Sequence, residues 1–123
     1  MKIVYATAQG TTEELIKKSL GIADAIKIVD GTEKIGEPFI LFTYTEGVGE
    51  TPPLVEKFLM NNSSHIKAVI GSGNIPFHAD TFAFAADNIG QKYNVPILYK
   101  IDCDCNADDI RRIKLLLLKW TRM

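Results

Sequence analysis

The chain has 123 residues, 46% of them hydrophobic and 24% charged, and its 14 lysines and arginines against 15 aspartates and glutamates give a net charge of −1. This length fits a single domain, residues 1–123, that can bury a core. The near-neutral charge argues against nucleic acid and anionic membrane surfaces as partners, and no apolar run reaches the length of a membrane span.

The start of the chain and its cysteines predict a cytoplasmic, reducing location. Residues 1–5 enter a strand-like segment directly, without the charged, apolar and small-residue succession of an export signal. The two cysteines, Cys103 and Cys105, are separated by one residue, which is no disulfide framework for a secreted domain. We interpret them as inert thiols in preference to a redox or metal-binding pair.

Apolar runs rich in β-branched and aromatic residues alternate along the chain with segments of helical periodicity. In chain order they predict a strand at residues 2–6, a helix at 12–20, strands at 26–29 and 38–42, a helix at 54–59, a strand at 66–70, a helix at 82–93, a strand at 97–101 and a helix at 110–120. Three helix starts are marked by capping residues, acids or prolines, namely Thr11 or Thr12 with Glu13 and Glu14, Thr51 before Pro52 and Pro53, and Asn106 with Asp108 and Asp109.

This alternation predicts an α/β fold with a mostly parallel sheet covered on both faces, because parallel neighbours need a crossover long enough for a helix. Residues 30–37 hold two glycines and little helical pattern, so we expect a plain loop there and an edge position for the strand before it. Five aromatic residues are interpreted as packing: Phe39, Phe42, Phe58, Phe82 and Trp120. Ligands of such sheets bind outside the carboxyl ends of the strands, which directs attention to three loops.

The first loop, residues 7–12, combines hydroxyl groups, a glycine and the free amides of a helix start, which together favour an anion. No lysine follows its glycine and the chain has no Gly-x-Gly-x-x-Gly, so neither a triphosphate loop nor a dinucleotide fingerprint is supported. A monophosphate held by neutral donors fits better. The same residues would also serve simply to cap the helix, and both interpretations stay open.

The second and third loops, residues 43–51 and 72–78, suggest recognition of a flat ring. Gly47 and Gly49 leave backbone groups free to turn towards a ligand, although an ordinary flexible turn would look the same. Asn74 could read the edge of a heterocycle and Phe77 could stack on it, while Ser-Gly-Asn is also common turn chemistry.

Two sets of residues resemble a known family. Residues 5–13, Tyr-Ala-Thr-Ala-Gln-Gly-Thr-Thr-Glu, resemble the phosphate loop of flavodoxins. Residues 43–52, 72–74, 82–89 and 93–100 look like NrdI, the small flavodoxins of class Ib ribonucleotide reductase. The resemblance implies a flavodoxin-like doubly wound sheet of five parallel strands in the order 2-1-3-4-5, with helices on both faces.

The resemblance also implies non-covalently bound FMN and no metal ligand or catalytic side chain of the protein's own. Its phosphate would lie on Thr7, Ala8, Gln9, Gly10, Thr11 and Thr12. Its ring would lie between one loop formed by Tyr44, Thr45, Glu46, Gly47, Val48 and Gly49 and another that includes Ser72, Gly73, Asn74, Phe77 and His78. Glu46 and Glu50 could oppose negative charge on a reduced ring, or be solvated loop acids.

In the family that the chain resembles, the reduced flavin reacts with dioxygen, and superoxide passes to the dimanganese site of the radical-bearing small subunit. The resemblance therefore implies a role in forming that subunit's tyrosyl radical, with a flavin or thiol reductase as electron source and a monomer as the working form. Two other readings stay open: a general one-electron-carrier flavodoxin, and a non-flavin regulatory module on the same fold.

Overall fold

The computed structural model describes residues 1–7, 11–44, 51–73, 84–102 and 106–121. Within these residues the strands are β1 (Lys2–Tyr5), β2 (Ile26–Lys27), β3 (Phe39–Tyr44), β4 (Ile66–Gly73) and β5 (Ile97–Asp102). The helices are α1 (Thr11–Glu14), a π-helical turn η1 (Leu15–Ser19), α2 (Pro53–Asn62), α4 (Phe84–Tyr93) and α5 (Ala107–Thr121). Each predicted strand and helix thus has a counterpart.

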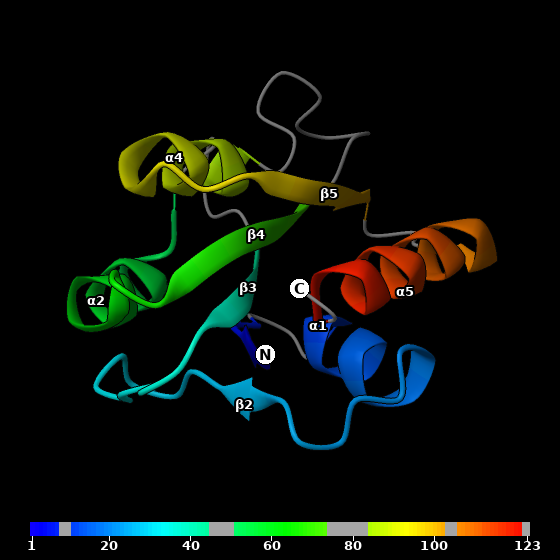
Figure 1. Ribbon diagram of the computed structural model, residues 1–123, viewed down its shortest axis with the longest axis horizontal. Helices are drawn as coiled ribbons and strands as arrows, with labels where there is room; N and C mark the ends of the chain where they lie inside the picture. Colours follow the sequence, from blue (N-terminus) through cyan, green and yellow to red (C-terminus); the bar gives the residue numbers. More distant parts are fainter. Residues whose placement is uncertain (8–10, 45–50, 74–83, 103–105, 122–123) are drawn as a thin grey trace.

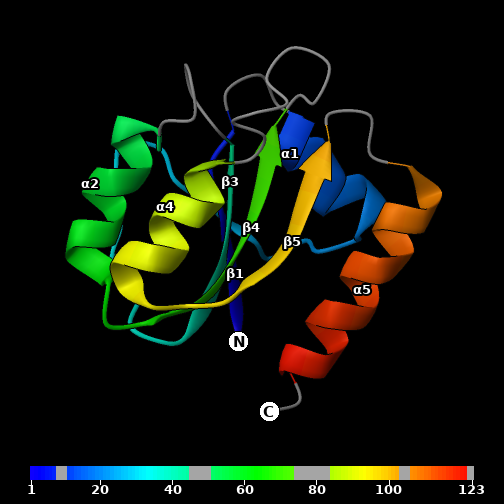
Figure 2. The ribbon, with the colours of Figure 1, turned by 90° about the horizontal axis from the view of Figure 1, so that it is seen from above.

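The strands form one parallel sheet in the order β2-β1-β3-β4-β5 (Figure 1). This is the order that the family resemblance implies. β2 lies at one edge as expected, next to β1, and its register pairs Val4 with Ile26 and Tyr5 with Lys27. Because every strand runs in the same direction, all of their carboxyl ends lie at one end of the sheet (Figure 2).

Alternate residues of the strands pack on opposite faces of the sheet, since successive side chains of a strand point to opposite sides. Helices α2 and α4 cover one face, and α1, η1 and α5 cover the other (Figure 1). The first core joins Val4, Phe39, Leu41 and Val69 to Val55, Phe58, Ala86 and Ile89 of the helices. The second joins Ile3, Tyr5, Ile40, Phe42 and Ile70 to Ile16, Ile113 and Leu117.

The predicted aromatic packing is confirmed where the structure describes it. Phe39 and Phe58 are buried and meet edge to face with their ring centroids 5.6 Å apart, and Phe42 is buried on the opposite face. Trp120 is partly buried against the second core. Phe82 lies outside the described residues.

The first helix differs from the single α-helix expected at residues 12–20. It has one α-helical turn, and then the Leu20 amide donates to the Leu15 carbonyl at 2.9 Å, which is the wider π spacing. Ile16 stays fully buried within the wide turn, and Leu15 and Leu20 pack beside it. Sequence periodicity does not distinguish these two kinds of turn over so few residues.

The link between β2 and β3 is a loop, as predicted, but it is not a plain one. The Glu33 carboxylate accepts hydrogen bonds from the backbone amides of Val29, Asp30 and Gly31, at 2.8, 3.2 and 3.0 Å. Gly31 has a left-handed φ of 83°, and a Cβ there would lie 3.1 Å from the Leu54 carbonyl oxygen, so glycine is required.

The three predicted helix starts have different outcomes. α1 begins at Thr11, and α5 follows Asn106, as the sequence indicates. α2 begins at Pro53, as the sequence indicates, but Thr51 does not cap it, because the N-cap residue is Pro52 and no side chain caps the helix. The Thr51 hydroxyl instead accepts a hydrogen bond from Asn88 of α4 at 3.3 Å.

Candidate functional site

The carboxyl ends of three neighbouring strands form the candidate site. Tyr5 near the end of β1 pairs with Phe42 of β3, and Tyr44 at the end of β3 pairs with Ser72 of β4. The three loops singled out in the sequence leave these strand ends, so the fold brings their starting points together at the carboxyl end of the sheet (Figure 2). This is the place where a doubly wound sheet binds its ligand, because the chain leaves β1 towards β2 and leaves β3 towards β4.

At the first strand end, the structure describes both sides of the predicted phosphate loop. Ala6 is buried and its amide donates to the Phe42 carbonyl at 2.9 Å, which holds the exit of β1 against β3. Thr7 is partly exposed, and Thr12 is buried in the first turn of α1. Thr11 begins the helix. Ala8, Gln9 and Gly10 lie outside the described residues.

The second and third loops are described only at their first residues. Tyr44 is partly buried and packs against the first core, and the Ser72 hydroxyl donates to the Thr43 carbonyl at 3.4 Å. Gly73 closes β4. The other residues predicted there lie outside the described part of the chain, as do both cysteines: Thr45, Glu46, Gly47, Val48, Gly49, Glu50, Asn74, Phe77, His78, Cys103 and Cys105.

Sequence reasoning missed a contact at the base of the first loop, the predicted phosphate loop. The Tyr5 hydroxyl donates to Glu13 Oε1 at 2.7 Å. Burial, together with the hydrogen bond to the charged Glu13, raises the pKa of Tyr5 to about 12, and the same hydrogen bond lowers the pKa of Glu13. Strand alternation places Tyr5 on the face that α1 covers, but no sequence signal identifies its partner.

The charges beside the first loop are compatible with a phosphate. Both acids of the first turn of α1 are ion-paired: Glu13 lies 3.6 Å from Lys17 and 3.9 Å from Lys27, and Glu14 lies 3.7 Å from Lys18. The loop therefore faces no uncompensated carboxylate among the described residues of α1. Thr7 and Thr12 add hydroxyl groups, which can donate hydrogen bonds to the oxygen atoms of a monophosphate.

A pocket at the opposite end of the sheet is separate from this site. Its volume is about 380 Å³. It lies beside the start of β1, the residues after η1 and the second half of α5, and its lining is mostly apolar: Met1, Ile3, Leu20, Ile22, Asp24, Lys114, Leu117 and Leu118. Among the described residues, none of those predicted to bind a ligand lines it.

No helix in the described ranges combines the length and the apolar character needed to cross a bilayer.

Comparisons with known proteins agree with the resemblance. The NrdI Flavodoxin like family matches residues 3–115. A relative, Protein NrdI of Bacillus licheniformis, is 36% identical over 110 residues, which cover 89% of this chain and 82% of that protein.

Solved structures similar to this chain are flavodoxins. Oxidised flavodoxin 1 from Bacillus cereus has a TM-score of 0.71 at 18% identity and covers 98% of this chain and 95% of that one. A short-chain flavodoxin associated with a non-canonical PDU bacterial microcompartment has the same TM-score and the same coverage at 19% identity. These TM-scores establish the flavodoxin fold. The family match over most of the chain goes further, and the chain belongs to the NrdI flavodoxin-like family.

Proposed function

We propose that this protein binds FMN non-covalently at the carboxyl ends of β1, β3 and β4, and supplies superoxide for assembly of a dimanganese-tyrosyl radical cofactor. The acceptor is the radical-bearing small subunit of class Ib ribonucleotide reductase. The observation that carries the proposal is the family match over residues 3–115, which contains all three predicted loops.

The residues of the site have separate tasks in this proposal. Thr7, Thr12 and the backbone of residues 8–11 hold the phosphate of FMN. The loops that begin after Tyr44 and at Ser72 flank the ring, and β3–β4 pairing keeps their starting points adjacent. His78 is a candidate for tuning the ring. When bound and reduced, FMN supplies the single electron that converts dioxygen to superoxide.

Binding is tested first, by titrating the purified protein with FMN and with riboflavin. We expect saturable quenching or shift of flavin emission, with FMN bound more tightly than riboflavin because the loop holds the phosphate. Thr7→Val should weaken FMN binding, and Thr32→Val, which removes a hydroxyl that donates to Asp30 in the remote β2–β3 loop, is the control. Absence of FMN uptake by the folded wild-type protein would refute the flavin proposal.

The oxidant role is tested with the manganese-loaded small subunit under air. Reduced, FMN-loaded protein should generate a tyrosyl radical detectable by electron paramagnetic resonance, and superoxide dismutase or omission of the protein should reduce the yield. FMN binding without radical formation would instead support a general one-electron-carrier flavodoxin, with other oxidoreductases as its partners.

A further inference from the structure

A tyrosine of β1 and a glutamate of α1 are hydrogen-bonded across the base of the first loop. Tyr5 is 1% exposed, and its hydroxyl reaches Glu13 Oε1 at 2.7 Å. The two residues stand on either side of the connection between β1 and α1, residues 6–10. The contact therefore fixes how the first turn of α1 lies against the end of β1.

The tyrosine is held rigidly. Its backbone lies between β2 and β3, in register with Lys27 and Phe42, and its ring belongs to the second core. The hydroxyl consequently reaches the edge of that core at a fixed point. The hydroxyl is the one polar atom of this buried side chain, and its hydrogen bond to Glu13 pairs it. The contact is specific, because leaving a buried hydroxyl unpaired is costly.

The glutamate connects three elements. Besides Tyr5 of β1, Glu13 lies near Lys17 of the adjoining π turn at 3.6 Å and near Lys27 of β2 at 3.9 Å. The continuous helical stretch from Thr11 to Ser19 is short, and helices of this length depend on tertiary contacts for their stability. Glu13 thus ties the start of this stretch to both neighbouring strands.

Near neutral pH the hydrogen bond has one direction, from the protonated tyrosine to the charged glutamate. The pKa of Tyr5 is raised and that of Glu13 lowered, so the tyrosine keeps the proton that it donates and the glutamate stays charged.

We propose that Tyr5 and Glu13 are positioning residues for the FMN phosphate, because their hydrogen bond holds the first turn of α1, which includes Thr12, in a fixed place against the end of β1. The inference rests on the proposed function, because it assumes that this loop binds a phosphate. It assigns the pair no contact with the cofactor. It predicts a selective effect: loss of the hydrogen bond weakens binding of the phosphate-bearing flavin and not of the flavin ring itself.

The test compares the dissociation constants of FMN and riboflavin for the wild type and Tyr5→Phe. Phenylalanine keeps the packing and removes the hydroxyl, so we expect FMN binding to weaken about three- to tenfold, the size of one hydrogen bond's net effect, and riboflavin binding to change less than twofold. Glu13→Ala gives a second variant at a partly exposed position. In a double-mutant cycle, Tyr5→Phe should then add little to Glu13→Ala.

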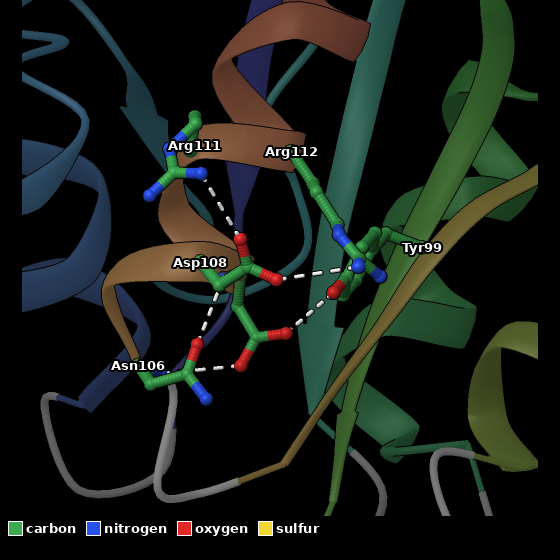
Figure 3. Close-up of polar contacts among 6 residues, drawn as sticks. Tyr99, Asn106, Asp108, Arg111 and Arg112 are labelled. Carbon is green, nitrogen blue, oxygen red and sulfur yellow. Dashed lines mark hydrogen bonds and ion pairs between the residues drawn. The ribbon is translucent and has the colours of Figure 1, made fainter.

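Tyr99→Phe is the matched control. Tyr99 of β5 makes the same kind of hydrogen bond, to Asp109 of α5 (Figure 3), and packs against the second core, on the same face of the sheet as Tyr5. This variant should leave the ratio of FMN to riboflavin affinity unchanged. If wild-type protein binds FMN and Tyr5→Phe changes both affinities equally, or no more than Tyr99→Phe does, the positioning role is wrong while the proposed function stands. If the wild type binds neither flavin, the proposed function fails and the positioning role with it.

Discussion

Asn62 is a buried side chain that joins two parts of the chain. It is 2% exposed, its Oδ1 accepts from the Ile35 amide at 2.7 Å, and its Nδ2 donates to the carbonyls of Glu33 and Phe58 at 2.7 and 2.9 Å. Three hydrogen bonds offset the cost of burying an amide. The end of α2 is thereby fixed to the β2–β3 loop.

We predict that Asn62→Ala destabilises the protein by about 2–4 kcal/mol, because it leaves the buried Ile35 amide and Glu33 carbonyl unpaired. Urea denaturation of the apoprotein measures the change. Asn61→Ala is the control, since Asn61 is exposed and makes longer bonds of 3.2 and 3.3 Å; its cost should stay within about 0.5 kcal/mol. Equal losses of unfolding free energy in the two variants would show that the buried hydrogen bonds of Asn62 stabilise the fold no more than the exposed ones of Asn61.

Single residues were predictable from the sequence where their role is to fill the core. Continuous apolar runs identify β1 and β3 as buried strands, and Phe39, Phe42 and Phe58 are packed as expected. The polar partners were not predictable. Asn62 accepts from a residue 27 positions away, and Tyr5 meets a glutamate eight positions away, and neither spacing leaves a periodic trace.

At the scale of the element, α5 shows a helix start that the sequence does specify. Asn106 Oδ1 accepts from the Asp109 amide at 2.9 Å, and the Asp109 carboxylate accepts from the Asn106 amide at 3.2 Å, which is a reciprocal cap (Figure 3). Asp108 is flanked by Arg111 and Arg112, each at 3.2 Å. The π turn η1 had no comparable signal, because the residues that open it are ordinary helix formers.

We predict that Asn106→Ala lowers the free energy of unfolding by about 1 kcal/mol, since alanine cannot accept from the Asp109 amide. Thermal or urea unfolding followed by circular dichroism provides the measurement. Asn106→Asp keeps an acceptor at the same place and should be close to wild type. Indistinguishable stabilities of the alanine and aspartate variants would contradict a capping role.

At the scale of the whole molecule, the sheet was the most predictable feature. Alternating strands and helices indicate parallel pairing, and the short link at residues 30–37 correctly places β2 at an edge. The full order came from the family resemblance. Local periodicity does not encode which strands lie next to each other, because that depends on contacts between distant segments. The ring-binding residues after β3 and β4 lie outside the described ranges and stay predictions.

Stability should fall on both sides of neutral pH. Hydrogen bonds from Tyr5, Thr32 and Tyr99 lower the pKa values of Glu13, Asp30 and Asp109 below their ordinary values of 4.5, 3.8 and 3.8. A carboxylate with a lowered pKa in the fold stabilises it above the unfolded pKa, and this contribution is lost as pH falls through the folded pKa. We therefore expect the melting temperature to decline below about pH 4.

At alkaline pH the dependence of stability on pH has the opposite sign, and stability falls as pH rises. The pKa of Tyr5 rises from an ordinary 10.0 to about 12, so its contribution is complete below pH 10.0 and is lost as pH rises towards 12. The hydrogen bond to Asp109 also raises the pKa of Tyr99. Absorbance titration of the folded protein should show Tyr5 and Tyr99 ionising later than a free tyrosine. Tyr5→Phe should remove one late step; four tyrosines ionising together near pH 10.0 would contradict this prediction.

The brevity of β2 has a consequence for how copies of the protein meet. An outermost strand normally offers a row of backbone donors and acceptors on which another polypeptide can build intermolecular sheet, a common route to aggregation. Here that strand has two residues, and the next amides, of Val29, Asp30 and Gly31, already donate to Glu33. An incoming chain would find these donors occupied, so the Glu33 carboxylate protects this edge of the sheet against the addition of another strand.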